Sequence, residues 1–118
     1  MSLEDFTIQI EANDQQNLTV IHVAGYLDAH TFEELEEAIN DLFGKKKYRV
    51  IVDLSKVEYI SSAGAGVFIG ALSEAQEHDG NIVLMNPTSN VREVFDLLGL
   101  TQIFQVVEDQ STALAAFQ

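Results

Sequence analysis

The chain has 118 residues, of which 47% are hydrophobic, and these values fit one globular domain with its own hydrophobic core. Its 19 acidic and 6 basic residues give a formal net charge of −13, which argues against binding to nucleic acid or to anionic membranes. The absence of cysteine excludes disulfides, thiol catalysis and thiolate metal sites.

We expect a cytoplasmic protein, because the chain starts without the basic region of a signal peptide. The longest apolar run, residues 63–72, is about half the length that a bilayer crossing requires. Basic residues are also uneven, since none precedes Lys45, so a partner steered by charge should be basic. We predict one domain over residues 1–118, with residues 1–4 as a flexible or cloning-derived start.

The first third of the chain predicts a hairpin followed by a helix. Residues 6–13 alternate apolar and polar side chains, as in a half-buried strand, and residues 18–25 form a second strand after a short turn. Thr31 is expected to begin the helix, with Glu34 completing a capping box. The apolar stripe of this helix consists of Phe32, Leu35, Ile39, Leu42 and Phe43.

The middle of the chain predicts two buried strands and a helix between them. Residues 48–55 contain consecutive β-branched residues, which is typical of an interior strand of a parallel sheet. Residues 57–60 lead to two serines, and residues 63–78 form a helix. Its apolar stripe consists of Val67, Phe68, Leu72 and Ala75. Residues 81–86 form the next strand, which Pro87 ends.

The last third predicts a short helix, a strand and a final helix. Thr88 or Ser89 caps the short helix, and Gly99 ends it. Its inward side chains are expected to be Val91, Val94, Phe95 and Leu98. Residues 103–107 form a strand, and Ser111 caps the last helix. The order β-β-α-β-α-β-α-β-α predicts a single α/β domain with a mixed, mostly parallel sheet flanked by helices.

The sequence YISSAGAG, residues 59–66, places two serines between a strand and a helix. They lie at the carboxyl end of the strand, where open α/β sheets usually place their sites. We expect Ser62 to be the N-cap of the helix, with a hydroxyl that another protein can also reach. The small side chains of residues 63–66 would let that protein approach closely, although tight packing of the helix on its sheet explains them equally well.

Several enzyme classes do not fit these residues. A dinucleotide-binding loop would need a third glycine at Ile69, and a nucleophile elbow would need a glycine at Ile60. No phosphate-binding string of the Walker type occurs. The three histidines are spread over a strand, a loop and a helix end. We therefore expect no catalytic residue, no cofactor and no metal site.

Three segments resemble the STAS domain family, in particular the stand-alone anti-sigma factor antagonists of bacteria. GYLDAHT, residues 25–31, resembles the glycine-x-leucine-aspartate loop before the first helix of that family. VIVDLSKVEYISSAGAGVFIGAL, residues 50–72, resembles its strand, its phosphorylatable serine and the glycine-x-glycine that follows. NVREVFDLLGLTQIFQVVEDQSTAL, residues 90–114, resembles its closing helix, turn, strand and helix. The match covers nearly the whole chain.

The resemblance implies a binding module that is not an enzyme. Its partner would be an anti-sigma factor that is also a serine/threonine kinase with a histidine-kinase-like ATPase fold. The kinase would phosphorylate Ser62 and end binding, and a metal-dependent serine/threonine phosphatase would reverse this. The partner-binding residues implied by position are Asp28, Ser61, Ser62, Ala63, Gly64 and Gly66. Asp28 matches the loop acid that the family uses near the kinase.

The chain departs from the family pattern at two positions. Ser61 stands where the family often has an aspartate, so Ser61 is a rival acceptor. Ala63 stands where many members have serine or threonine, which removes another rival. One alternative is a STAS interaction or scaffold domain of another partner-switching pathway, without efficient phosphorylation. A small-ligand binder or enzyme with its cleft near Ser62 is a weaker alternative, because no acid–base group faces that serine.

Overall fold

The structure is a computed structural model that describes residues 6–117, so the predicted flexible start at residues 1–4 lies outside the described residues. The elements are β1 Thr7–Asn13, β2 Leu18–Leu27, α1 Phe32–Gly44, β3 Arg49–Ile60, α2 Ser62–Glu77, β4 Asn81–Met85, α3 Ser89–Leu97, the 3-10 helix η2 Leu100–Gln102, β5 Gln105–Val107 and α4 Gln110–Ala115. The predicted element order is confirmed, and η2 is an additional short turn between α3 and β5.

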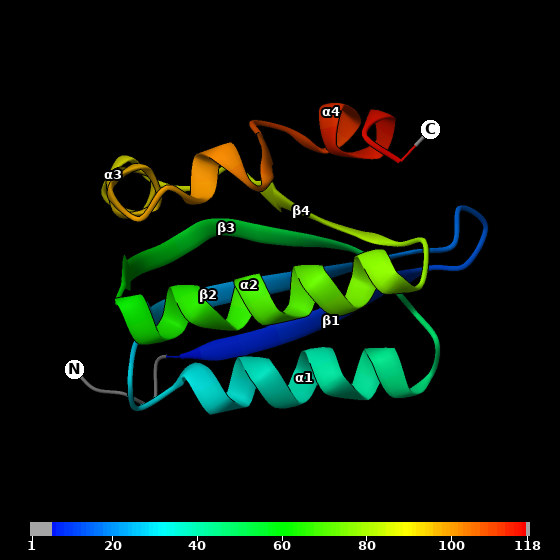
Figure 1. The fold of residues 1–118 in the computed structure, drawn as a ribbon, viewed down its shortest axis with the longest axis horizontal. Helices are drawn as coiled ribbons and strands as arrows, with labels where there is room; N and C mark the ends of the chain where they lie inside the picture. Colours follow the sequence, from blue (N-terminus) through cyan, green and yellow to red (C-terminus); the bar gives the residue numbers. More distant parts are fainter. Residues whose placement is uncertain (1–5, 118) are drawn as a thin grey trace.

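The five strands form one mixed sheet in the order β1-β2-β3-β4-β5. β1 is antiparallel to β2, and the other neighbouring pairs are parallel. Helices α1 and α2 run side by side in the same direction along the sheet (Figure 1). Because they are the crossover helices of consecutive parallel strands, their N-termini lie at the same edge as the carboxyl ends of β2 and β3.

Hydrophobic side chains fill both faces of the sheet. The larger core cluster joins one face to α1, α2 and α3, and the smaller cluster packs α4 against the other face. Residues 50–52 of β3 are fully buried, as predicted for an interior strand, and the predicted α2 stripe is buried too. The predicted α1 stripe is buried except for Phe32, which is partly buried. Within residues 6–117, no helix is long and apolar enough to cross a membrane.

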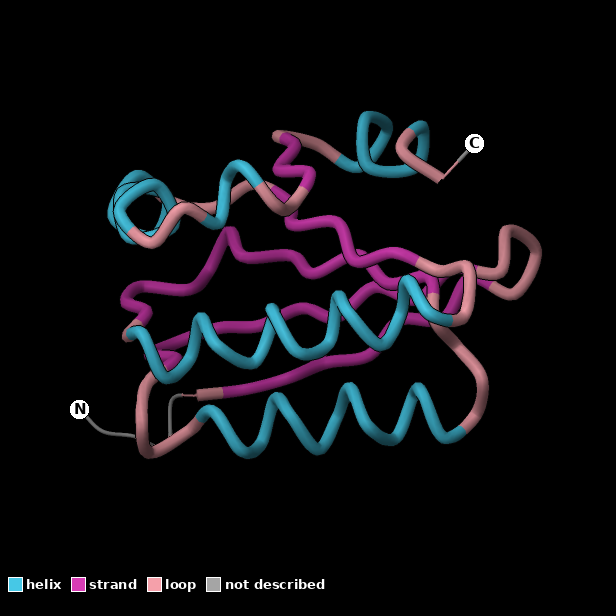
Figure 2. Tube along the Cα trace, viewed as in Figure 1, coloured by secondary structure: helices cyan, strands magenta, loops and turns pink. Residues whose placement is uncertain are grey.

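Strand β3 is longer than the strand over residues 48–55 that the sequence predicts. It runs without a break to Ile60, which pairs with Leu27 at the end of β2. Two shifts of register along β2 and β3 absorb the extra residues, and Val57 and Ile60 remain buried. The strand therefore leads almost directly into α2, with Ser61 alone between them, as the short connection in Figure 2 shows.

The turn after α3 confirms one prediction and corrects another. Gly99 has a φ of +76°, which ends the helix, and Leu100 after it is buried. Leu98 is exposed rather than inward, because α3 ends at Leu97 and Leu98 is the C-cap residue at the start of the turn. Thr88 is the N-cap of this helix, since its side chain accepts a hydrogen bond from Val91 N.

Two predictions near the C-terminus are wrong. Strand β5 contains only Gln105–Val107, whereas Ile103 is exposed in the turn before it. Ser111 does not cap the last helix: Asp109 is the N-cap, and its Oδ1 accepts a hydrogen bond from Thr112 N at 2.8 Å. The carboxylate of Asp109, two residues earlier, takes the bond from the free N–H of Thr112, and the Ser111 hydroxyl instead donates to Asp109.

Candidate functional site

The junction of β3 and α2 separates the two serines into different roles. Ser61 N donates to Leu27 O at 3.0 Å, and Ser61 Oγ accepts from Gly64 N at 3.3 Å. Ser61 is therefore the N-cap, with extended backbone angles (φ −101°, ψ 171°), and the prediction that Ser62 caps the helix is wrong. The bond from Ser61 N to Leu27 O holds Ser61 in the extended conformation of an N-cap, so the helix begins at Ser62.

Ser62 is the first residue of α2, and its side chain is exposed. Among the described residues its hydroxyl has no hydrogen-bond partner, whereas the Ser61 hydroxyl is partly buried and occupied by the cap. The first N–H groups of a helix have no partner within the helix, and they favour negative charge near them. The Ser62 hydroxyl is thus accessible and stands where a phosphate would be electrostatically favourable.

The small residues after Ser62 divide between packing and surface. Gly64 is buried, and a Cβ placed there would lie 2.5 Å from Leu27 O and 2.8 Å from Leu27 Cγ. This glycine therefore lets α2 pack closely on β2, and we assign it to positioning rather than to direct contact with a partner. Ala63 and Gly66 are exposed, and a Cβ at Gly66 would meet nothing within 4 Å. The uncluttered surface consists of Ser62, Ala63 and Gly66.

The loop before α1 holds Asp28 through a buried threonine. Thr31 is 3% exposed; its hydroxyl donates to Tyr26 O at 2.7 Å and accepts from Asp28 N at 3.0 Å. The predicted capping box between Thr31 and Glu34 does not form, because the threonine side chain faces back into the loop. Asp28 Oδ1 accepts from His30 N at 2.9 Å. These bonds give the Asp28 loop a fixed shape.

Asp28 and Ser62 lie at the same edge of the sheet. Leu27 and Ile60 end two neighbouring parallel strands and pair with each other, so Asp28 and Ser61 follow from adjacent positions. The hydrogen bond from Ser61 N to Leu27 O joins the two connections directly. The structure thus brings the predicted loop acid and the predicted acceptor serine to one end of the fold, although they are 34 positions apart in the sequence.

Two tyrosines beside this edge were not identified from the sequence. Tyr26 and Tyr59 are partners on β2 and β3, their ring centroids are 5.8 Å apart, and they are 51% and 47% exposed. Exposed aromatic rings are enriched in protein interfaces. The only sequence signal was that each tyrosine immediately precedes the last residue of its strand. Their pairing depends on the shifts of register, which no local pattern predicts.

A separate polar cluster links β1, β2 and β3. His22 Nδ1 lies 2.7 Å from Asp53 Oδ2, and His22 Nε2 lies 2.8 Å from Glu11 Oε1. Burial alone would lower the pKa of His22, but the hydrogen bonds to both carboxylates outweigh it and raise the pKa above the ordinary 6.5. Burial would raise the pKa of Asp53, but bonds from Ser55 and His22 lower it below the ordinary 3.8.

This cluster is an ionic link across three strands and lies away from the α2 N-terminus. The three side chains of this cluster are not arranged as metal ligands. Within residues 6–117, no group of three or more His, Asp or Glu side chains is arranged to hold a metal ion. The chemistry of the Ser62 edge is therefore that of an accessible hydroxyl on a small-residue surface, next to a carboxylate in a fixed loop.

Known proteins are similar to this chain over most of its length. The family model for the STAS domain matches residues 9–113. The Anti-sigma-B factor antagonist of Staphylococcus epidermidis is 30% identical over 101 residues, which cover 86% of this chain and 94% of that protein. The family-model match extends through all the elements that form the Ser62 edge.

Solved structures show the same fold. An anti-sigma factor antagonist from Mycobacterium paratuberculosis superposes with a TM-score of 0.87 at 24% identity, covering 98% of this chain and 97% of that chain. The phosphorylated form of the Bacillus cell fate determinant SpoIIAA superposes with a TM-score of 0.73 at 23% identity, covering 95% and 100%. With a family model that spans nearly all the described elements, this chain belongs to the STAS domain family.

Proposed function

We propose that this chain is an anti-sigma factor antagonist whose binding is switched off by phosphorylation of Ser62. The observation that carries the proposal is the exposed Ser62 hydroxyl at the start of α2, free of hydrogen bonds among the described residues. Relatives named anti-sigma factor antagonists support it, and SpoIIAA has been solved in a phosphorylated form. The chain would act as a binding module in the cytoplasm and not as an enzyme.

The switch has a simple chemical form. Ser62 Oγ attacks the γ-phosphorus of ATP, its proton passes to a base of the kinase, and ADP leaves. Hydrolysis by a metal-dependent serine/threonine phosphatase returns the serine and inorganic phosphate. Ser61 is the poorer acceptor, because its partly buried hydroxyl accepts the bond from Gly64 N and modification would remove the helix cap.

The phosphate would act on the interface and leave the fold unchanged. It adds about −1.5 to −2 charges at neutral pH, which the N-terminus of α2 tolerates electrostatically. A partner that docks closely over Ser62, Ala63 and Gly66 would meet new bulk and would have to strip water from a dianion. A loss of about 2 to 3 kcal/mol in binding lowers the affinity roughly 30- to 150-fold.

Phosphorylation with the anti-sigma factor kinase from the same genome tests the proposal. The purified chain is incubated with that kinase and ATP, and the products are analysed by mass spectrometry. One phosphate is expected on the wild type and on Ser61→Ala, and none on Ser62→Ala. Labelling that persists in Ser62→Ala would contradict the assignment of the acceptor. Tight binding to the kinase without any labelling would favour the scaffold alternative, since Ser61 replaces the aspartate that often precedes the acceptor.

A further inference from the structure

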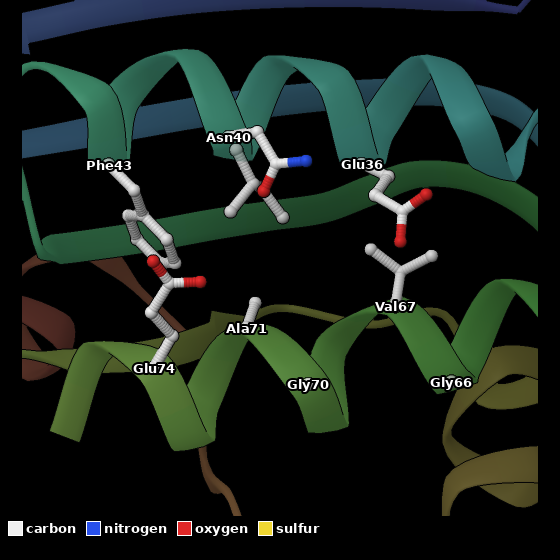
Figure 3. A pocket seen from close by; sticks show the side chains of 9 residues that line it. Glu36, Asn40, Phe43, Gly66, Val67, Gly70, Ala71 and Glu74 are labelled. Atoms are coloured by element: carbon white, nitrogen blue, oxygen red, sulfur yellow. The ribbon is translucent and has the colours of Figure 1, made fainter. Parts of the chain in front are cut away.

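Helices α1 and α2 leave an open groove of about 240 Å³ between them (Figure 3). Ser62 does not line this groove. The floor of the groove is apolar and includes Val67 and Ala71 of α2. The side chains of Glu36 on α1 and Glu74 on α2 both point into the space between the helices, and Asn40 lies between them along the groove. The groove therefore combines an apolar floor with oxygen acceptors along its length.

Glycines keep this groove open. A Cβ built at Gly66 or at Gly70 would meet nothing within 4 Å, and both residues are exposed. The close packing of α2 on the sheet does not explain them, in contrast to the buried Gly64. Each glycine costs the helix about 1 kcal/mol relative to alanine. The two glycines leave room above the floor for side chains that come from another molecule.

The charge around the groove has one sign. Helix α1 contains five Asp and Glu residues, helix α2 contains two, and neither helix contains Lys or Arg. Among residues 6–117, the ion pairs involve Glu11, Asp53 and Asp14, so Glu36 and Glu74 have no cationic partner within the described chain. A positive charge that neutralises Glu36 and Glu74 therefore has to come from another molecule.

The groove is also continuous with the proposed switch. Ser62, Gly66 and Gly70 recur every four residues on α2, so they follow one another along one side of the helix. The groove thus begins one turn after Ser62. A partner that docks over Ser62 can extend along this groove without leaving the surface, and Asp28 lies at the same end of the fold.

We propose that the groove between α1 and α2 binds a basic segment of the anti-sigma factor, whose arginine side chains enter it. This inference rests on the proposed function and names the chemistry of that partner surface. Arginine fits because its methylene stem packs on an apolar floor while its guanidinium donates to carboxylate and amide oxygens. The groove adds affinity and orients the partner, whereas the phosphate on Ser62 decides whether binding occurs.

Charge removal with a matched control tests the groove. The double variant Glu36→Gln/Glu74→Gln removes two charges that line the groove, and Glu33→Gln/Glu77→Gln removes one charge from each of the same helices outside it. We measure the Kd of the kinase used above by calorimetry at about 0.15 M salt, where long-range steering is screened. The groove variant should bind at least ten-fold more weakly, and the control should stay within two-fold of the wild type.

Filling the groove provides a second, uncharged test. Gly70→Leu places a side chain in the open space, and Ser73→Leu adds the same side chain at an exposed α2 position outside the groove. Gly70→Leu should weaken kinase binding at least ten-fold with a melting temperature no lower than that of the wild type, since leucine favours a helix more than glycine does, whereas Ser73→Leu should bind like the wild type. Equal binding of the groove variants and their controls would overturn the inference.

The outcomes separate the groove from the switch. If the groove variants bind like the wild type while phosphorylation of Ser62 still ends binding, the groove inference fails and the proposed function stands. If the wild type neither binds the kinase nor is phosphorylated, both fail. If Gly70→Leu abolishes only self-association, measured by analytical ultracentrifugation, the occupant is a second copy of this chain and the inference is overturned.

Discussion

Replacement of Gly64 by alanine should loosen the N-terminus of α2 and destabilise the fold. The added Cβ would lie 2.5 Å from Leu27 O, a distance that real Cβ atoms essentially never show. Leu27 O also accepts the hydrogen bond from Ser61 N, so it cannot move without disturbing the cap residue. The clash therefore involves backbone, and a change of rotamer cannot relieve it.

The magnitude follows from two opposing terms. Alanine in place of glycine stabilises a helix by about 1 kcal/mol. Overpacking typically costs about 1 to 3 kcal/mol, and the upper end applies here because the neighbour is a backbone carbonyl. The net loss is about 2 kcal/mol of unfolding free energy. For a domain of this size it corresponds to a melting temperature lower by roughly 6 to 10 °C.

Gly66→Ala in the same helix is the control, since a Cβ at Gly66 meets nothing within 4 Å. It should stabilise the protein by up to about 1 kcal/mol. Urea unfolding followed by circular dichroism gives both values, and the two variants should differ by about 3 kcal/mol. Gly64→Ala should also slow phosphorylation of Ser62, because the start of α2 moves. If both variants are equally stable, the close approach of α2 to β2 is wrong.

Three further predictions concern single side chains. The raised pKa of His22 means that its ion pairs contribute fully to the unfolding free energy below about pH 6.5, and that this contribution is lost as the pH rises through the raised pKa. Urea unfolding from pH 5 to 9 should show the loss of stability, and the His22→Gln variant should not show this pH dependence. Thr31→Val should cost about 1 to 3 kcal/mol, since it leaves Tyr26 O and Asp28 N without their partner; an unchanged unfolding midpoint would contradict this. Ser61→Ala should lower the unfolding free energy by about 1 kcal/mol, because the helix cap is lost, and should leave Ser62 phosphorylated. A variant that mass spectrometry shows to be unphosphorylated would contradict the assigned roles.

Periodicity and glycine signals were sufficient to predict the architecture. The β-branched residues 50–52 occupy an interior strand because an all-apolar run can only be buried on both faces of a sheet. The stripe of α2 faces the core because its apolar residues recur at helical spacing. Gly99 ends α3 because its positive φ suits glycine. These features depend on local chemistry, so one sequence reveals them.

The identity of the helix caps could not be predicted in the same way. Both Ser61 and Ser62 suit an N-cap by residue type. The choice depends on how far β3 stays paired with β2, which is a tertiary property that includes two shifts of register. Thr31 likewise carries the local signature of a capping box, but the buried loop needs its hydroxyl for Tyr26 O and Asp28 N.

The surfaces around the site required the structure for a further reason. The groove between α1 and α2 joins residues of two helices that strand β3 separates in the chain. The sequence places Glu36 in a run of glutamates, which by itself is typical of a solvated helix face. Gly66 and Gly64 looked equivalent, yet one is exposed and the other is packed against Leu27. Spatial neighbours decide these roles.

The affinity of the anti-sigma factor for the two phosphorylation states tests the central claim most directly. Wild-type chain is phosphorylated to one phosphate on Ser62, separated from the unmodified chain, and each form is titrated with the kinase in the calorimeter. The unmodified chain should bind, and the phosphorylated chain should bind at least 30-fold more weakly with an unchanged melting temperature. Equal affinities, or a phosphorylated chain that has lost its folded stability, would contradict a switch that acts at the surface of Ser62.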